Sequence, residues 1–277
     1  MRCSPAVLGS RTAPAAGRYP RPVTSPRRTG FLGRVGKGIR HPSLAWAYLR
    51  RTLRNKRLST DEARTSHLAF YRRVMADDVA HKTARGAVGT ADPEEWLELG
   101  ERQFRYLADH GLRLDHRMLE IGCGNLRAGW RFIEFLGVGA YTGVDISPEI
   151  LIAAEETLAE RGLQAKRPYL FLVDDMSFAA LPEAHFDVVH AHSVFSHSPV
   201  EVVEAALAGI RRVIRPDGFF DFTYNESADG TYWGVLREDF FYPRSMLVDL
   251  AARYGYTAEP MPDWVHPQAK LRLRPHP

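Results

Sequence analysis

An apolar strand that ends in an acidic residue and a Gly-Cys-Gly turn constrains the fold of this chain more than any other feature. Residues 117–124 read Arg-Met-Leu-Glu-Ile-Gly-Cys-Gly. Two glycines allow a tight turn and let a ligand approach the backbone without meeting a Cβ atom. Apolar residues then recur at helical spacing, which predicts a helix over 125–136. The pattern indicates a nucleotide-type site at the carboxyl end of the first strand of an α/β sheet, where a helix N-terminus presents free N–H groups.

The residues after the turn distinguish between ligand classes. A dinucleotide-binding loop has the form G-x-G-x-x-G, in which the third glycine keeps helix and strand close. Here Arg127 occupies the third glycine position, which disfavours an NAD-dependent oxidoreductase. A phosphate-binding P-loop is disfavoured as well, because no Gly-Lys-Ser/Thr follows the turn.

The run at residues 120–124, Glu-Ile-Gly-Cys-Gly, resembles motif I of the class I S-adenosylmethionine-dependent methyltransferases, which usually reads E/D-x-G-x-G. The elements behind it follow the order of that family, so the resemblance extends from about Arg113 to the C-terminus. It implies a Rossmann-like, doubly wound sheet of seven strands, mostly parallel with an antiparallel last strand. It also implies S-adenosyl-L-methionine as cofactor, whose methionine end would be shaped by Glu120, Gly122, Cys123 and Gly124.

The predicted second strand lies within residues 141–147 and ends in the acidic residue Asp145. Asp145 lies 21 positions after Gly124. Its two carboxylate oxygens match the two vicinal hydroxyl groups of a ribose, and the resemblance implies this role, with Ile146 beside it in the cofactor site. The alternative is that Asp145 caps the helix predicted from Pro148 to about Arg161.

The predicted third strand, over 169–173, is followed by two aspartates and a methionine. The resemblance implies that Asp175 binds the adenine amino group and that the N–H of Met176 meets a ring nitrogen. Asp174 is the alternative acid, and an ordinary polar turn is the alternative structure. Two further residues join the predicted cofactor site: His190 in the fourth strand, and Arg127, which either pairs with the methionine carboxylate or faces solvent.

Three histidines fall within eight positions around the end of the predicted fourth strand, 186–193: His190, His192 and His197. No metal is predicted, because zinc sites also use cysteine or carboxylate ligands at defined spacings. The stretch resembles motif IV of the family, which lies beside cofactor and acceptor. Because histidine titrates near neutral pH, His197 is the predicted general base, with a structural hydrogen bond to its loop as the alternative. Tyr224 and His266 are the next catalytic candidates.

The remainder of the chain completes the predicted sheet. A fifth strand is expected over 219–225, after a turn at 215–218, and a loop is expected from Glu226 to Tyr242. A helix over 244–254 and two strands, around 257–261 and 269–274, then follow.

The charge of the chain is concentrated at its start. Residues 1–60 hold 14 of the 37 Lys and Arg residues and none of the 33 Asp and Glu residues, which leaves the remainder with a net charge of −10. Nucleic-acid binding by the core is therefore disfavoured. Residues 1–42 are predicted to be a disordered basic tail; a transit peptide and a wrongly assigned start codon are alternatives. Without a recognisable signal peptide or disulfide pattern, we expect a reducing, cytoplasmic location.

Residues 43–112 predict a helical N-terminal extension before the methyltransferase domain at 113–277. Within it, residues 43–58 form an amphipathic pattern with basic residues. Such a helix contacts an anionic membrane or docks on the acidic core. The helix expected over 93–110 resembles segments that cover the cofactor in the family and help form the acceptor pocket.

The sequence thus predicts methyl transfer, most simply to a hydroxyl group of a small molecule, a sugar or a lipid-linked acceptor. The family's nucleic-acid enzymes often carry an Asn/Asp-Pro-Pro-Tyr/Phe motif after the fourth strand, whereas residues 192–195 here read His-Ser-Val-Phe. The rival interpretation is a non-catalytic Rossmann-like module that binds a cofactor and acts as a scaffold.

Overall fold

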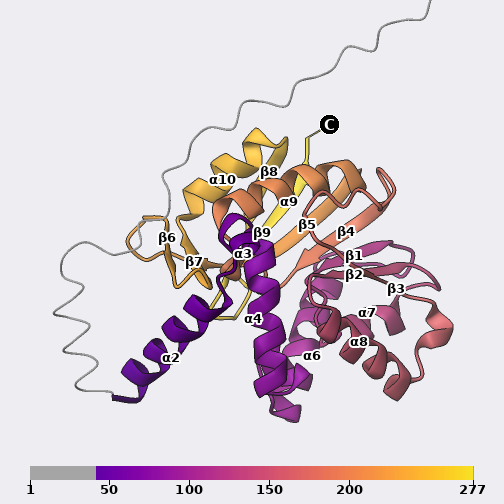
Figure 1. The fold of residues 1–277 in the computed structure, drawn as a ribbon. Helices are drawn as coiled ribbons and strands as arrows, with labels where there is room; N and C mark the ends of the chain where they lie inside the picture. Colours follow the sequence, from indigo (N-terminus) through magenta and orange to yellow (C-terminus); the bar gives the residue numbers. More distant parts are fainter. Residues whose placement is uncertain (1–41, 277) are drawn as a thin grey trace, which may run out of the picture.

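Nine strands hydrogen-bond into one sheet within residues 42–276, the part of the chain that the computed structural model describes (Figure 1). Five of them run parallel in the order β3-β2-β1-β4-β5. Their bounds are β1 Met118–Ile121, β2 Tyr141–Asp145, β3 Tyr169–Leu172, β4 Phe186–Ala191 and β5 Ile214–Glu226.

The last two strands close the sheet as the sequence predicted. β9 (Ala269–Pro275) pairs antiparallel with β5, and β8 (Tyr256–Pro260) pairs antiparallel with β9. These two strands and the five parallel ones make up the predicted seven-stranded, mostly parallel sheet. The doubly wound Rossmann-like fold class is therefore confirmed.

Two predictions about β5 and the segment behind it were wrong. Residues 226–242 are not only a loop, because they contain a hairpin of β6 (Trp233–Val235) and β7 (Asp239–Tyr242). The hairpin is held by stacking of Trp233 on Phe241, whose ring centroids lie 4.0 Å apart, and β7 extends the sheet at the end of β5. The strand β5 also begins before the expected turn, and residues 215–218 bulge out between two paired stretches.

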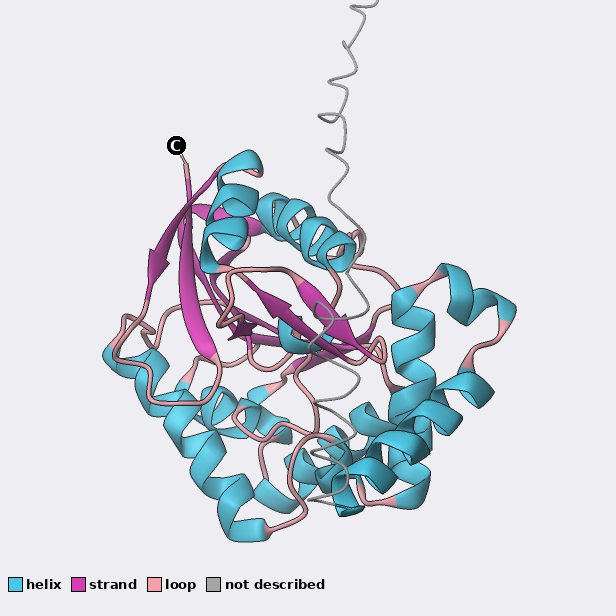
Figure 2. Cartoon of the chain, turned by 90° about the vertical axis from the view of Figure 1, so that its left-hand side faces the viewer, coloured by secondary structure: helices cyan, strands magenta, loops and turns pink. Residues whose placement is uncertain are grey.

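Helices cover both faces of the sheet (Figures 1 and 2). α9 (Val200–Val213) and α10 (Arg244–Arg253) pack on one face, while α6 (Pro93–Asp109), α7 (Gly129–Phe135) and α8 (Pro148–Arg161) pack on the other. α8 has the bounds predicted from the sequence. Ser147 caps its start, and Gly162 ends it in the left-handed conformation, with φ +67°.

The helix after the glycine turn is shorter than predicted. α7 begins at Gly129 rather than residue 125, because Leu126 adopts a left-handed conformation with φ +62°. The preceding turn also packs closely under α6: a Cβ atom on Gly100 would lie 2.1 Å from the carbonyl oxygen of Arg127. Residues 125–128 thus form a non-helical turn before α7.

The N-terminal extension consists of short helices that begin at side-chain caps. Thr60, Ser66, Thr83 and Asp92 cap the successive helices after α2. The helices are α2 (Pro42–Leu58), α3 (Asp61–Thr65), α4 (His67–His81), α5 (Ala84–Ala87) and α6. None of the helices in the described residues is long and apolar enough to span a membrane. The predicted disordered tail lies outside the described residues, apart from Pro42, and the domain boundary at 112 stays a prediction.

The strand order determines where a ligand can bind. β1 lies between β2 and β4, so the chain leaves β1 toward one side of the sheet and leaves β4 toward the other. A crevice opens at such a switch point, outside the carboxyl ends of the strands. The glycine turn and His197 are both located there.

Candidate active site

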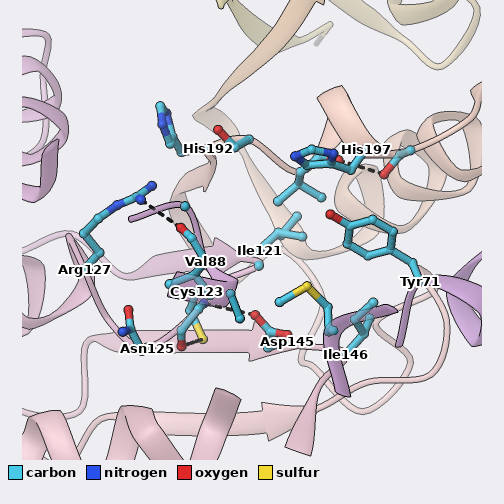
Figure 3. Close-up of a pocket in the computed structure, with 18 of the residues that line it drawn as sticks. Tyr71, Val88, Ile121, Cys123, Asn125, Arg127, Asp145, Ile146, His192 and His197 are labelled. Atoms are coloured by element: carbon cyan, nitrogen blue, oxygen red, sulfur yellow. Dashed lines mark hydrogen bonds between the residues drawn. The ribbon is translucent and has the colours of Figure 1, made fainter. Parts of the chain in front are cut away.

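A cavity of about 500 Å³ lies over the carboxyl ends of β1, β2 and β4 (Figure 3). Its floor includes the glycine turn and the residues that follow β2. Its other walls come from α4, residues 86–89, α6, the loop after β4 and the β6–β7 hairpin. The helical extension therefore covers this site, although α4 and residues 86–89 contribute as well as the predicted segment over 93–110.

The glycine turn is shaped for close approach. Gly122 and Gly124 have φ angles of +64° and +58°, which favour glycine. A Cβ atom on Gly122 would lie 2.5 Å from Cγ2 of Val194, so no side chain fits there without movement. The buried Cys123 side chain packs where Gly143 leaves room, because a Cβ atom on Gly143 would lie 2.9 Å from its Sγ atom.

The Asp145 carboxylate joins the ends of the first two strands. Its oxygens accept hydrogen bonds from the N–H groups of Gly124 and Ser147, each at 3.0 Å. Burial raises the pKa of Asp145, against these stabilising hydrogen bonds. Ser147, not Asp145, caps α8 by accepting a hydrogen bond from the Ile150 N–H. Asp145 and Ile146 line the cavity where the sequence predicted a ribose contact.

Glu120 and Arg127 place a buried acid and a half-buried cation in the same cavity. Tyr141 donates a hydrogen bond to Glu120, yet burial still raises the pKa of this carboxyl group to about 7. Arg127 donates from Nη1 to the Val88 carbonyl at 2.9 Å, while its Nε atom is buried without a partner. Since Arg127 is half-buried and lines the cavity, the solvent-facing alternative was wrong.

Three predicted residues lie outside the cavity. The exposed Asp175 carboxylate accepts a hydrogen bond from the Ser177 N–H at 2.8 Å, which is the polar-turn alternative. His190 is buried in the core against Phe132, because β4 turns its side chain away from the cavity. Tyr224 is likewise buried within the core. Met176 does line the cavity, as predicted.

His197 lies at the cavity wall opposite the glycine turn (Figure 3). Its Nδ1 atom is 2.7 Å from the Glu238 carbonyl oxygen, and since a carbonyl only accepts, Nδ1 carries the proton. The same nitrogen lies 3.4 Å from Oδ1 of Asp239. Nε2 of a neutral His197 is therefore the unprotonated nitrogen, the atom that a general base needs.

Sequence reasoning missed the residues that hold His197 in place. Tyr71 stacks on its ring with centroids 5.5 Å apart, and His67 stacks on Tyr71 in turn. His67 also donates from Nε2 to the His197 carbonyl at 2.8 Å, and burial lowers its pKa to about 4, which keeps it neutral near pH 7. His67 and Tyr71 lie four residues apart on α4, a spacing that places them on one helix face.

A second pair of histidines lines another wall. The rings of His192 and His266 lie 5.0 Å apart, and burial lowers the pKa of both. His266 thus reaches the cavity as predicted, but Nδ1 accepts a hydrogen bond from the Gln268 N–H. Among residues 42–276, no group of three or more His, Cys, Asp and Glu side chains is arranged to hold a metal ion.

Comparisons with known proteins identify the domain. A sequence model of the methyltransferase domain matches residues 119–220. The probable methyltransferase ltbC of Aspergillus luteorubrus is 27% identical over 153 residues, which are 54% of this chain and 50% of that protein. An uncharacterised methyltransferase of Schizosaccharomyces pombe is 31% identical over 106 residues, 37% of either chain. The chain therefore spans half or less of the length of these curated relatives.

Solved structures share the fold. The 1,6-didemethyltoxoflavin-N1-methyltransferase of Burkholderia thailandensis, solved with bound 1,6-didemethyltoxoflavin and S-adenosylhomocysteine, has a TM-score of 0.57 at 18% identity and covers 79% of this chain and 92% of its own. DhpI, solved with S-adenosylhomocysteine, has a TM-score of 0.52 at 16% identity over 76% of this chain and 96% of its own. The family model, the relatives and the fold agree: residues 119–220 are a methyltransferase domain, and they lie in a fold shared with class I S-adenosylmethionine-dependent methyltransferases, enzymes whose methyl donor is S-adenosyl-L-methionine.

Proposed function

We propose that this chain transfers the methyl group of S-adenosylmethionine to a hydroxyl group of a small molecule, a class in which we include sugars and lipid-linked alcohols. The observation that carries the proposal is the orientation of His197. Nδ1 donates its proton in a hydrogen bond to the Glu238 carbonyl, so Nε2 remains available as a base in the cavity that also contains the glycine turn. A hydroxyl acceptor needs such a base more than an amine or thiol does.

The residues around the cavity fit the cofactor. Gly122 and Gly124 present a backbone turn without side chains, Asp145 offers carboxylate oxygens for a ribose, and the unpartnered Nε of Arg127 offers a donor for the methionine carboxylate. Bound S-adenosylmethionine supplies a methyl group that its sulfonium already activates. What remains for the protein is to align the acceptor for in-line displacement, and fixed geometry is worth about 7–11 kcal/mol of such a barrier.

In the proposed reaction, His197 takes the hydroxyl proton on Nε2 as the acceptor oxygen bonds to the methyl carbon. The S–CH₃ bond breaks, its electron pair returns to sulfur, and S-adenosylhomocysteine leaves. The Asp239 carboxylate, 3.4 Å from Nδ1, lies beside the ring that receives the proton. Tyr71 keeps the ring in position by stacking, and its hydroxyl group points into the cavity in Figure 3.

Transfer of a labelled methyl group tests the proposal. The full chain is incubated with methyl-labelled S-adenosylmethionine and matched panels of alcohols and phenols, amines and thiols. We expect label on the hydroxyl panel and a turnover about 10²-fold lower or more in His197→Gln, because glutamine keeps hydrogen bonding but cannot act as a base near neutral pH. His81→Gln, an exposed histidine outside the cavity, is the matched control.

The alternatives give different results. Label on amines or thiols alone would contradict O-methylation. Cofactor binding without transfer to any panel would favour the scaffold interpretation. Normal turnover with an intact pH–rate profile in His197→Gln would remove His197 as the base, and His266 would then be the next candidate in the cavity.

A further inference from the structure

The side of α2 that faces away from the rest of the molecule combines apolar and basic residues. Trp46, Leu49 and Leu53 are 63%, 45% and 59% exposed. Their spacing of three and four residues places them along one side of the helix. Two basic residues that flank this row are also exposed: Arg50 and Lys56. Arg57 is exposed as well but pairs with Asp77 on α4. Figure 1 shows α2 extending outward from the sheet and the other helices.

The opposite side of α2 is attached to the protein by polar contacts. Arg51 pairs with Asp239 at 2.7 Å, and Arg54 pairs with Asp78 at 2.8 Å and with Glu238 at 2.5 Å. A helix that packs on a protein core usually turns its apolar side inward. In α2 the charged side is turned inward and the apolar side is left outside, so docking on the core does not account for the apolar row.

We propose that this outward face, made of Trp46, Leu49, Leu53, Arg50 and Lys56, binds the surface of an anionic membrane. Tryptophan and leucine enter the boundary between headgroups and acyl chains, while neighbouring lysine and arginine side chains contact lipid phosphates. The proposal concerns how the protein is located, so it does not depend on the nature of the methyl acceptor.

Charge favours a membrane over other partners for this face. Residues 1–41, which precede α2, contain nine Lys and Arg residues and no acidic residue. Its positive charge would repel the basic residues of this face if it contacted them, whereas the same charge adds to the attraction of the protein for an anionic surface. A second copy of the chain would likewise place equal charges opposite each other in a symmetric pair.

Sedimentation with vesicles tests the proposal on the full chain. We expect binding to vesicles of phosphatidylcholine with phosphatidylglycerol, weak binding to phosphatidylcholine alone, and release at high salt. The combined variant Trp46→Ser, Leu49→Ser and Leu53→Ser should lose this binding. The control variant places serine at three apolar positions of similar exposure outside α2 and should still bind the vesicles. These positions are Leu114, Val138 and Ile152, which are 63%, 66% and 63% exposed.

A charge variant gives a quantitative check. Arg50→Glu with Lys56→Glu removes two cations, each of which contributes about fivefold to binding, so at least a roughly 30-fold loss is expected. Arg113→Glu with Arg167→Glu makes the same change in net charge at exposed positions outside α2. Circular dichroism and cofactor binding establish that each variant is folded.

Several results would overturn the proposal. One is the absence of binding to anionic vesicles, and another is an equal loss in the control variants. Chemical cross-links between α2 and residues 1–41, or a dimer in sedimentation velocity that the serine variant abolishes, would assign the face to the other partners. Methyl transfer is not the readout, so failure of the proposed reaction and failure of membrane binding are separate outcomes.

Discussion

Replacement of Asp145 by asparagine should weaken cofactor binding while keeping the shape of the side chain. The carboxylate is buried at 9% exposure and lines the cavity, where its charge would strengthen the hydrogen bonds from the ribose of our proposal. A hydrogen bond to a charged group is worth about 1.5–3 kcal/mol. The dissociation constant of S-adenosylhomocysteine should therefore rise about 10- to 150-fold.

The affinity of the wild-type chain should also depend on pH. Because burial raises the pKa of Asp145, the carboxylate gains its proton at a higher pH than an ordinary aspartate. The ionised form is the one that binds the ribose better, so the advantage of the wild type over Asp145→Asn should shrink as the pH falls through that raised pKa.

Isothermal titration with S-adenosylhomocysteine measures both effects. Asp175→Asn is the matched control, because this aspartate is exposed outside the cavity. Asparagine at 145 has one acceptor oxygen for the two backbone N–H groups that Asp145 binds, so thermal melting must establish that the variant is folded. Wild-type affinity in a folded Asp145→Asn chain, or an equal loss in the control, would exclude a specific role of the Asp145 charge in cofactor binding.

Three further predictions concern the same cavity. Burial raises the pKa of Glu120 from 4.5 to about 7, so between these pH values the native chain keeps a proton that the unfolded chain releases. The free energy of unfolding should therefore fall by about 3 kcal/mol as the pH rises from 4.5 to 7. Urea unfolding measures this fall, which should be smaller in Glu120→Gln. Gly122→Ala should cost about 1–3 kcal/mol in the same assay, because the new Cβ atom meets Val194. Asp239→Asn should lower turnover but leave titrated cofactor affinity unchanged, since Asp239 contacts His197; unchanged turnover would contradict its role.

The sequence was most informative where chemistry and local geometry coincide. The turn of Gly122 and Gly124 needs positive φ angles, and these were expected from the residue types alone. Asp145 ends its strand as predicted, and its placement beside the glycine turn follows from parallel pairing of β1 and β2. These features require only a few consecutive residues and a common sheet topology.

Strand ends limited the prediction of individual side chains. β4 ends at Ala191, so His190 stays in the sheet and faces the core, while His192 belongs to the loop and lines the cavity. β3 ends at Leu172, and the chain then turns Asp175 outward. A difference of a few residues in a strand end therefore decides whether a side chain reaches a site.

The acceptor side of the cavity could not be predicted, because its residues come from distant segments. Tyr71 lies on α4 and Asp239 begins β7, yet both contact His197. Only packing of the helical extension and the hairpin around the switch point brings them together. Arg51 joins this group through Asp239, and no local sequence pattern indicates that contact.

A crystal structure of the full chain with S-adenosylhomocysteine would directly test whether this cavity binds the cofactor with its sulfur facing His197. We expect the ribose hydroxyl groups to bind the Asp145 carboxylate and the methionine end to lie over the Gly122 turn. The sulfur should face His197, with space for a hydroxyl acceptor between them. Binding of the ligand elsewhere would rule out this cavity as the cofactor site, and a sulfur turned away from His197 toward a closed wall would rule out His197 as the base.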